Sequence, residues 1–136
     1  MKNRMGALII LALVLNGCKS GSAAATKEIE SHSAGDVVIS LANEKGELAQ
    51  GQNSFVIGFR SASKNEPIDP GKVTVESSMA MPGMAPMTAP IELESTGKPG
   101  QYTVKGEFGM SGAWRFEVRW DGPAGQGSTS FHSNVR

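Results

Sequence analysis

The chain has 136 residues and carries thirteen Lys or Arg against thirteen Asp or Glu, so its formal net charge is zero at pH 7. This length is enough for one domain of ordinary size. The balanced charge and the lack of a basic patch argue against a nucleic acid as a partner.

The N-terminal segment is predicted to be a signal peptide that covers residues 1–17. Lys2 and Arg4 precede an apolar run from Ala7 to Leu15, which is shorter than the ~20 apolar residues that span a bilayer. This layout is typical of secretion. The run ends in Leu-Asn-Gly-Cys18, which resembles a bacterial lipoprotein signal, and the resemblance implies that Cys18 is lipidated. The alternative is a soluble exported protein with a free thiol.

A lipid on Cys18 would anchor the chain to a membrane of the cell envelope. By the same resemblance, Lys19 in place of an acidic residue permits sorting to the outer membrane, facing the periplasm, if the host is Gram-negative. With its only Cys acylated, the mature domain would have neither a disulfide nor a thiolate metal site. Residues 18–35 are small and polar and are predicted to form a flexible linker. His32 is expected to be a solvated residue of that linker.

Residues 36–136 are predicted to form one all-β domain, an antiparallel β-sandwich of about seven strands. Apolar and polar residues alternate in several short runs, which indicates strands with one buried face. The clearest run is residues 114–120, where two Trp, a Phe and a Val alternate with charged side chains. Gly, Pro and Asn clusters separate the runs, as is typical of a sandwich.

The most unusual stretch is Met79-Ala-Met-Pro-Gly-Met-Ala-Pro-Met87, which holds four of the seven methionines. A thioether is a soft, neutral donor, and the metals that favour it are soft ones such as Cu(I). Met79 and Met81 are two residues apart, so on a strand they would point to one face. The Pro-Gly turn that follows could fold Met84 and Met87 back towards them.

Met110 is the fifth candidate donor. Because the loops of a sandwich cluster at its two ends, Met110 could approach Met84 and Met87, and three thioethers would satisfy Cu(I). Trp114 could cap such a site, although ordinary core packing is the alternative for this residue. Methionine also fills gaps in cores and lines adaptable surfaces. An apolar contact loop and plain packing therefore remain alternative interpretations of the methionine run.

The sequence lacks the constellations that are typical of enzymes. No His lies in the context of a Ser or Cys nucleophile, no Gly-rich phosphate loop opens a helix, and no paired-His zinc motif occurs. We therefore expect a protein that is not an enzyme.

Three motifs together resemble the YtkA-like and FixH-like domains of bacterial exported proteins: Ser-Met-Ala-Met-Pro-Gly-Met84, Gly-Gln-Tyr102 and Phe108-Gly-Met-Ser-Gly-Ala-Trp-Arg-Phe-Glu-Val118. The resemblance covers roughly residues 36–120 and implies a small Ig-like β-sandwich. FixH-like members have a membrane helix in place of a lipid anchor, so this chain is closer to the YtkA type. Copper carriers of the CopC type are less similar, because an N-terminal histidine suited to Cu(II) is absent. The matching positions are Met79, Met81, Met84, Tyr102, Met110, Gly112 and Trp114.

The resemblance also implies a setting, because some members are lipoproteins or modules associated with copper and heavy-metal efflux or with cytochrome oxidase assembly. Together with the methionine pattern, it predicts a membrane-anchored, periplasm-facing lipoprotein that binds Cu(I) or Ag(I) and passes it to an efflux system or a cuproprotein. The alternative is an interaction module that docks an efflux or oxidase-assembly partner through an apolar methionine loop, without metal. The candidate metal ligands are Met79, Met81, Met84, Met87 and Met110.

Overall fold

The computed structural model describes residues 26–136, so the predicted signal peptide, Cys18 and the first part of the linker lie outside the described residues. Nine strands make up this part of the chain. They are β1 (Lys27–Ala34), β2 (Val37–Asn43), β3 (Gly51–Ser61), β4 (Lys72–Met79), β5 (Met87–Ala89), β6 (Ile91–Ser95), β7 (Gln101–Phe108), β8 (Gly112–Gly122) and β9 (Gly125–Val135).

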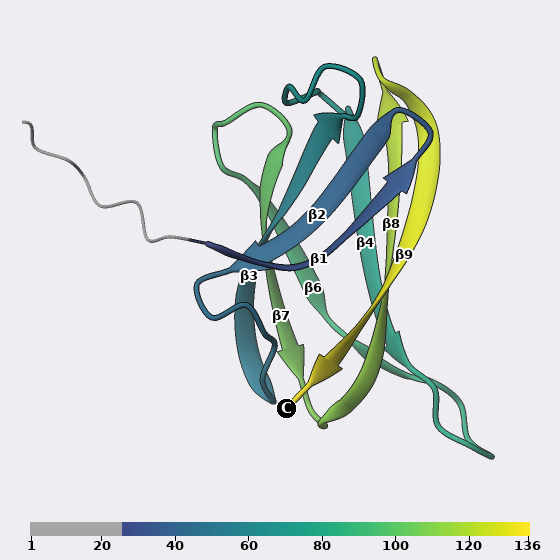
Figure 1. Ribbon diagram of the computed structural model, residues 1–136. Helices are drawn as coiled ribbons and strands as arrows, with labels where there is room; N and C mark the ends of the chain where they lie inside the picture. The colour runs from purple at the N-terminus through teal and green to yellow at the C-terminus, as the bar shows by residue number, and fades with distance from the viewer. Residues whose placement is uncertain (1–25) are drawn as a thin grey trace, which may run out of the picture.

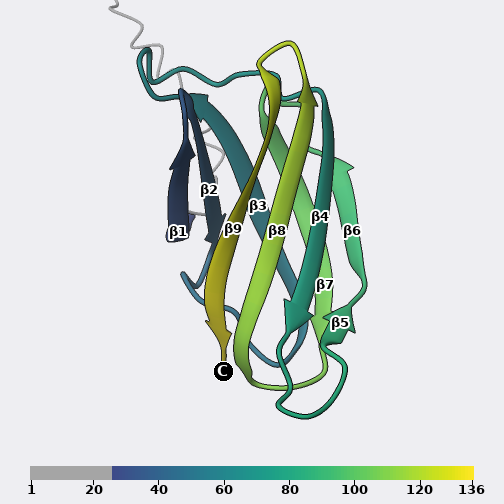
Figure 2. The same cartoon turned by 90° about the vertical axis from the view of Figure 1, so that its right-hand side faces the viewer.

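The strands form two layers that pack face to face (Figures 1 and 2). One sheet has the order β1-β2-β3-β7-β6 and the other has the order β5-β4-β8-β9. All neighbouring strands within the sheets run antiparallel. The predicted antiparallel β-sandwich is therefore confirmed, with β1 and β5 as strands that the alternation of apolar residues did not indicate.

Residues 26–136 contain no helix that is long and apolar enough to cross a membrane.

The core between the two layers is built largely from aromatic rings. Phe116 of β8 meets Phe55 of β3 and Phe108 of β7 edge to face, with ring centroids 5.7 and 5.6 Å apart. Phe59 meets Trp120 in the same way at 5.9 Å. These side chains are at most 5% exposed, and edge-to-face pairs add about 0.5–1.5 kcal/mol beyond the burial of their area. The alternation predicted for residues 114–120 is confirmed, because its apolar members point into this core.

Strand β1 occupies residues for which the sequence predicted a flexible linker up to Gly35, so the prediction is wrong for this part of the linker. Residues 27–34 instead pair with β2 along their whole length, so the domain begins before Asp36. The reason is that a ladder of main-chain hydrogen bonds needs no apolar pattern, and an edge strand tolerates charged and polar side chains. His32 is half-buried rather than solvated, since its ring lies 4.9 Å from the ring of Phe131 in β9.

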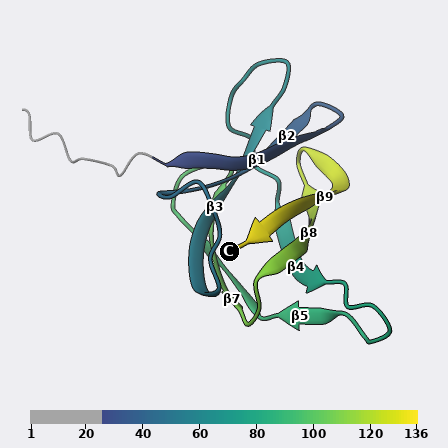
Figure 3. The same ribbon diagram turned by 60° about the horizontal axis from the view of Figure 1, so that its bottom comes forward.

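Strand β5 is short because prolines bracket it. Pro86 precedes Met87, and Pro90 follows Ala89. Proline has no N–H to donate to a neighbouring strand, and after Pro90 the chain enters β6, which belongs to the other sheet. The methionine run therefore becomes a narrow hairpin between β4 and β5, which projects beyond the two layers in Figure 3.

Candidate functional site

The tip of the β4–β5 hairpin is a tight turn over Met81-Pro-Gly-Met84. Gly83 has a φ of 73°, and the N–H of Met84 donates to the carbonyl oxygen of Met81 at 3.1 Å. Proline at the second position and a glycine with positive φ at the third are the requirements of a type II turn. The turn predicted at Pro82 and Gly83 is therefore present, and it reverses the chain between the first and last methionines.

Met79 and Met87 lie directly opposite each other in the β4–β5 ladder. Residues opposite each other in an antiparallel pair project to the same face, with their Cβ atoms ~4.5–5.5 Å apart. Met79 is 9% exposed. Both Met81 and Met87 are half-buried and pack against the core. Three methionines of the hairpin thus pack against the core, and the hairpin itself lies at the bottom of Figure 2.

The loop between β7 and β8 lies next to this cluster. A Cβ on Gly112, the first residue of β8, would come within 2.9 Å of the sulfur of Met79. The absence of a side chain at position 112 therefore leaves the space that the Met79 thioether occupies. Met110 lies two residues before Gly112, so the sandwich brings the fifth methionine to the same end as the hairpin.

Two side-chain hydrogen bonds hold the β7–β8 loop. The indole N–H of Trp114 donates to the carbonyl oxygen of Met110 at 3.0 Å, and the side-chain amide of Gln50 donates to the carbonyl oxygen of Gly109 at 2.9 Å. Trp114 is fully buried and lies 5.0 Å from the ring of Phe108, so it is a core residue that also positions the loop. Sequence reasoning missed Gln50, because nothing local connects it to a loop 59 residues away.

Exposure divides the five predicted ligands into two groups. Met79, Met81 and Met87 pack against the core, whereas Met84 is 70% exposed and Met110 is 41% exposed. The sequence predicted that both Met84 and Met87 would fold back towards Met79 and Met81, and for Met87 this is confirmed by its pairing with Met79. Met84 instead stands at the tip of the turn.

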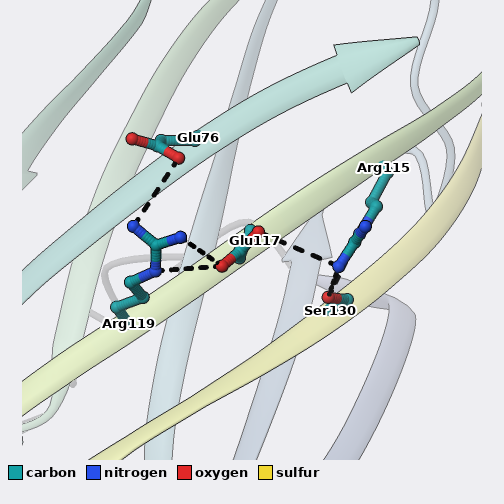
Figure 4. Close-up of polar contacts among 5 residues, drawn as sticks. All are labelled: Glu76, Arg115, Glu117, Arg119 and Ser130. Atoms are coloured by element: carbon teal, nitrogen blue, oxygen red, sulfur yellow. Dashed lines mark hydrogen bonds and ion pairs between the residues drawn. The ribbon is translucent and has the colours of Figure 1, made fainter. Parts of the chain in front are cut away.

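Several charged side chains form a network away from the hairpin. On the outer face of the β5-β4-β8-β9 sheet, the guanidinium of Arg119 donates to Glu117 at 2.9 Å and lies 3.9 Å from Glu76 (Figure 4). Arg115 lies 3.8 Å from Glu117 and donates to Ser130 at 2.9 Å. Within residues 26–136, no group of three or more His, Cys, Asp or Glu is placed to hold a metal ion.

The groups with displaced pKa values also lie away from the hairpin. The pKa of Asp36 is lowered below 3.8, first by a hydrogen bond from the backbone N–H of Ser63 and then by one from the hydroxyl of Ser61. Burial, and to a smaller degree the charge of Asp69, raises the pKa of Tyr102 above 10.0. Neither residue contacts the methionines, so the hairpin presents neutral sulfur and main-chain groups.

Comparison with known proteins places this architecture in a family. The YtkA-like family model matches residues 31–119, which is more than half of the chain. Among solved structures, the chain is similar to a DUF4426 family protein from Pseudomonas aeruginosa PAO1, with 11% sequence identity and a TM-score of 0.51 over 78% of this chain and 96% of that chain. A likeness at this identity shows the fold alone. No curated protein matches the chain.

Proposed function

The chain belongs to the YtkA-like family, and from this premise we propose that it is an envelope lipoprotein that binds Cu(I) or Ag(I) through the methionines of the β4–β5 hairpin and the β7–β8 loop. Cys18 carries the lipid anchor, and the bound metal passes to an efflux or cuproprotein-assembly component. The protein acts as a carrier and performs no catalysis.

The observation that carries this proposal is the convergence of methionines at one end of the sandwich. Met79 and Met87 face each other across the ladder, and Met81 of the same hairpin also packs against the core. Met110 lies on the adjoining loop, whose main chain is fixed by Trp114. A rigid base with two exposed thioethers, on Met84 and Met110, suits a metal that must be taken up and released.

Thioether ligands also determine how binding depends on pH and on the metal. They carry no proton to lose, unlike His or Cys, so Cu(I) affinity stays nearly constant around neutral pH. Zn(II) prefers nitrogen, thiolate and carboxylate donors, so it binds poorly. Exchange is fast because no strongly basic ligand holds the metal.

The decisive variant is Met81→Leu combined with Met84→Leu. Leucine keeps the apolar volume at a cost usually under ~1.5 kcal/mol, so the fold survives while two donor sulfurs are lost. We expect competition titrations with a Cu(I) chelator, under reducing conditions, to give at least about tenfold weaker binding. Val38→Leu, which introduces the same side chain at a half-buried position outside the hairpin, is the control and retains wild-type affinity.

A second candidate function rests on the exposure of Met84 and Met110, the two exposed large apolar side chains of residues 26–136. In this alternative the hairpin tip docks a partner protein and the sulfurs bind no metal. The same double variant separates the two. Unchanged Cu(I) binding in that variant contradicts the metal proposal, and unchanged capture of envelope partners contradicts the docking alternative.

A further inference from the structure

A cleft of about 440 Å³ lies on the outer face of the β1-β2-β3-β7-β6 sheet. It is bordered by the loop between β3 and β4 and by the turn between β6 and β7, which lie at the upper end of the molecule in Figure 1, whereas the methionine hairpin projects at the lower right. The volume falls within the range of small-molecule sites, ~300–1,000 Å³. The proposed metal function makes no use of this cleft.

Small residues on the neighbouring strands β2 and β3 form the floor of the cleft and leave its space open. Gly58 of β3 lies directly opposite Ser40 of β2, and Val56 lies opposite Ala42 one step further along. A Cβ on Gly58 would lie 3.2 Å from the hydroxyl oxygen of Ser40, so even one methyl group would begin to fill this space. The lower half of the floor, at Val56 and Ala42, is apolar.

The walls of the cleft are held by main-chain contacts. The N–H of Phe59 donates to the carbonyl oxygen of Gly100 at 2.7 Å, and the N–H of Ile68 donates to the carbonyl oxygen of Phe59 at 3.2 Å. A Cβ on Gly100 would come within 2.4 Å of the carbonyl oxygen of Ile68, so the two walls meet directly. Because these bonds form without a ligand, binding requires little ordering of the protein.

Two cations line the cleft, and neither forms an ion pair with another residue of 26–136. Arg60 follows Gly58 on the same face of β3, and Lys98 lies in the β6–β7 turn. Among the described residues, no carboxylate oxygen lies within 4.0 Å of either cation. The Arg60 guanidinium makes one hydrogen bond, to the side-chain oxygen of Asn65 at 3.1 Å, and retains other donors.

We propose that this cleft binds a small organic anion. Its carboxylate or phosphate is held by Arg60 and Lys98, and its apolar body lies over Gly58 towards Val56 and Ala42. Arg60 and Val56 are four residues apart on one strand, or about 13 Å, which suits a compact ligand with a charged end. Ser40 at the centre of the floor offers a hydroxyl to a polar group of the ligand.

Benzoate, phenyl phosphate and benzyl alcohol are suitable probes, because they share an apolar ring and differ in the charged group. Their binding to the full chain in a non-ionic detergent can be followed by saturation-transfer NMR of the probe signals. We expect saturable binding of at least one anion and at least about tenfold weaker binding of benzyl alcohol. Whichever of benzoate and phenyl phosphate binds more tightly identifies the class of anion.

Three variants locate the binding. Arg60→Gln with Lys98→Gln should weaken anion binding by at least about tenfold, whereas Lys45→Gln, an exposed cation outside the cleft, should leave it unchanged. Gly58→Val fills the floor without altering any charge, and it should abolish binding while circular dichroism reports an intact fold. Any one of three results would overturn the proposal. Benzyl alcohol could bind as tightly as the anions, or the Lys45 control could lose as much anion affinity as the double variant. The third such result is that no probe shows saturable binding.

Discussion

Exposure gives the five methionines of the described chain different chemical reactivity. Met84 and Met110 are 70% and 41% exposed, whereas Met79 is 9% exposed and its sulfur lies over Gly112. Oxidation of a thioether to a sulfoxide follows the access of the oxidant.

We therefore expect hydrogen peroxide to oxidise Met84 and Met110 well before Met79. Timed exposure of the folded chain, followed by mass spectrometry of its peptides, measures this order. The denatured chain is the control, in which the differences between sites should largely disappear. If Met79 in the folded chain reacted as quickly as Met84, the packing of the hairpin against β8 would be wrong.

Asp36 links the β1–β2 turn to the loop after β3, through hydrogen bonds from the backbone and hydroxyl of Ser63 and from the hydroxyl of Ser61. Because these bonds favour the carboxylate, the pKa of Asp36 is lower in the folded state than its ordinary value of 3.8. A lowered folded pKa contributes stability that is present above the unfolded pKa and is lost as the pH falls through the folded pKa.

The Asp36→Asn variant should therefore be less stable than wild type at neutral pH, and the gap should narrow below pH 3.8. Urea denaturation of both proteins at a series of pH values measures the difference in the free energy of unfolding. A gap that did not change between neutral and acidic pH would show that the Asp36 carboxylate is not stabilised by these contacts.

The stability of the β4–β5 hairpin depends on its turn. Gly83 has a φ of 73°, a region that costs an L residue roughly 1–2 kcal/mol. Gly83→Ala should lower the free energy of unfolding by about 1 kcal/mol, measured by urea denaturation. The control is Gly109→Ala, since Gly109 has no positive φ and a Cβ there would meet nothing within 4 Å. Equal effects of the two substitutions would contradict the type II turn.

Strand β1 closes one side of the sandwich. It pairs with β2 through seven residue pairs and also lays His32 against Phe131 of the opposite sheet. Its removal would leave the main-chain groups of β2 unpaired and uncover part of Phe131.

We predict that a chain starting at Asp36 is less stable than one starting at Thr26. Favourable cross-strand pairs contribute roughly 0.2–1 kcal/mol each, so the seven pairs of β1 together should contribute at least about 1 kcal/mol. Urea denaturation of the two truncated chains measures this difference directly. Equal stability would mean that the domain begins at Asp36, as the composition of the linker suggested.

Local patterns of residues were enough to predict the all-β class, most of the strands and the turn at Pro82 and Gly83. Each of these follows from interactions between residues close in the chain: alternation with a period of two and the backbone preferences of proline and glycine. These patterns also indicated that Met87 returns towards Met79, because a Pro-Gly turn between two extended segments forms a hairpin.

Contacts between segments that are far apart in the chain could not be predicted in this way. The pairing of polar β1 with β2, the contact between Met79 and Gly112, and the hydrogen bond from Gln50 to Gly109 leave no periodic signal in the sequence. The cleft beside Arg60 and Lys98 was equally hidden, since it depends on two turns whose main chains bond to each other. These contacts form between groups that become neighbours only when the two sheets pack, and main-chain hydrogen bonds look the same for almost every side chain.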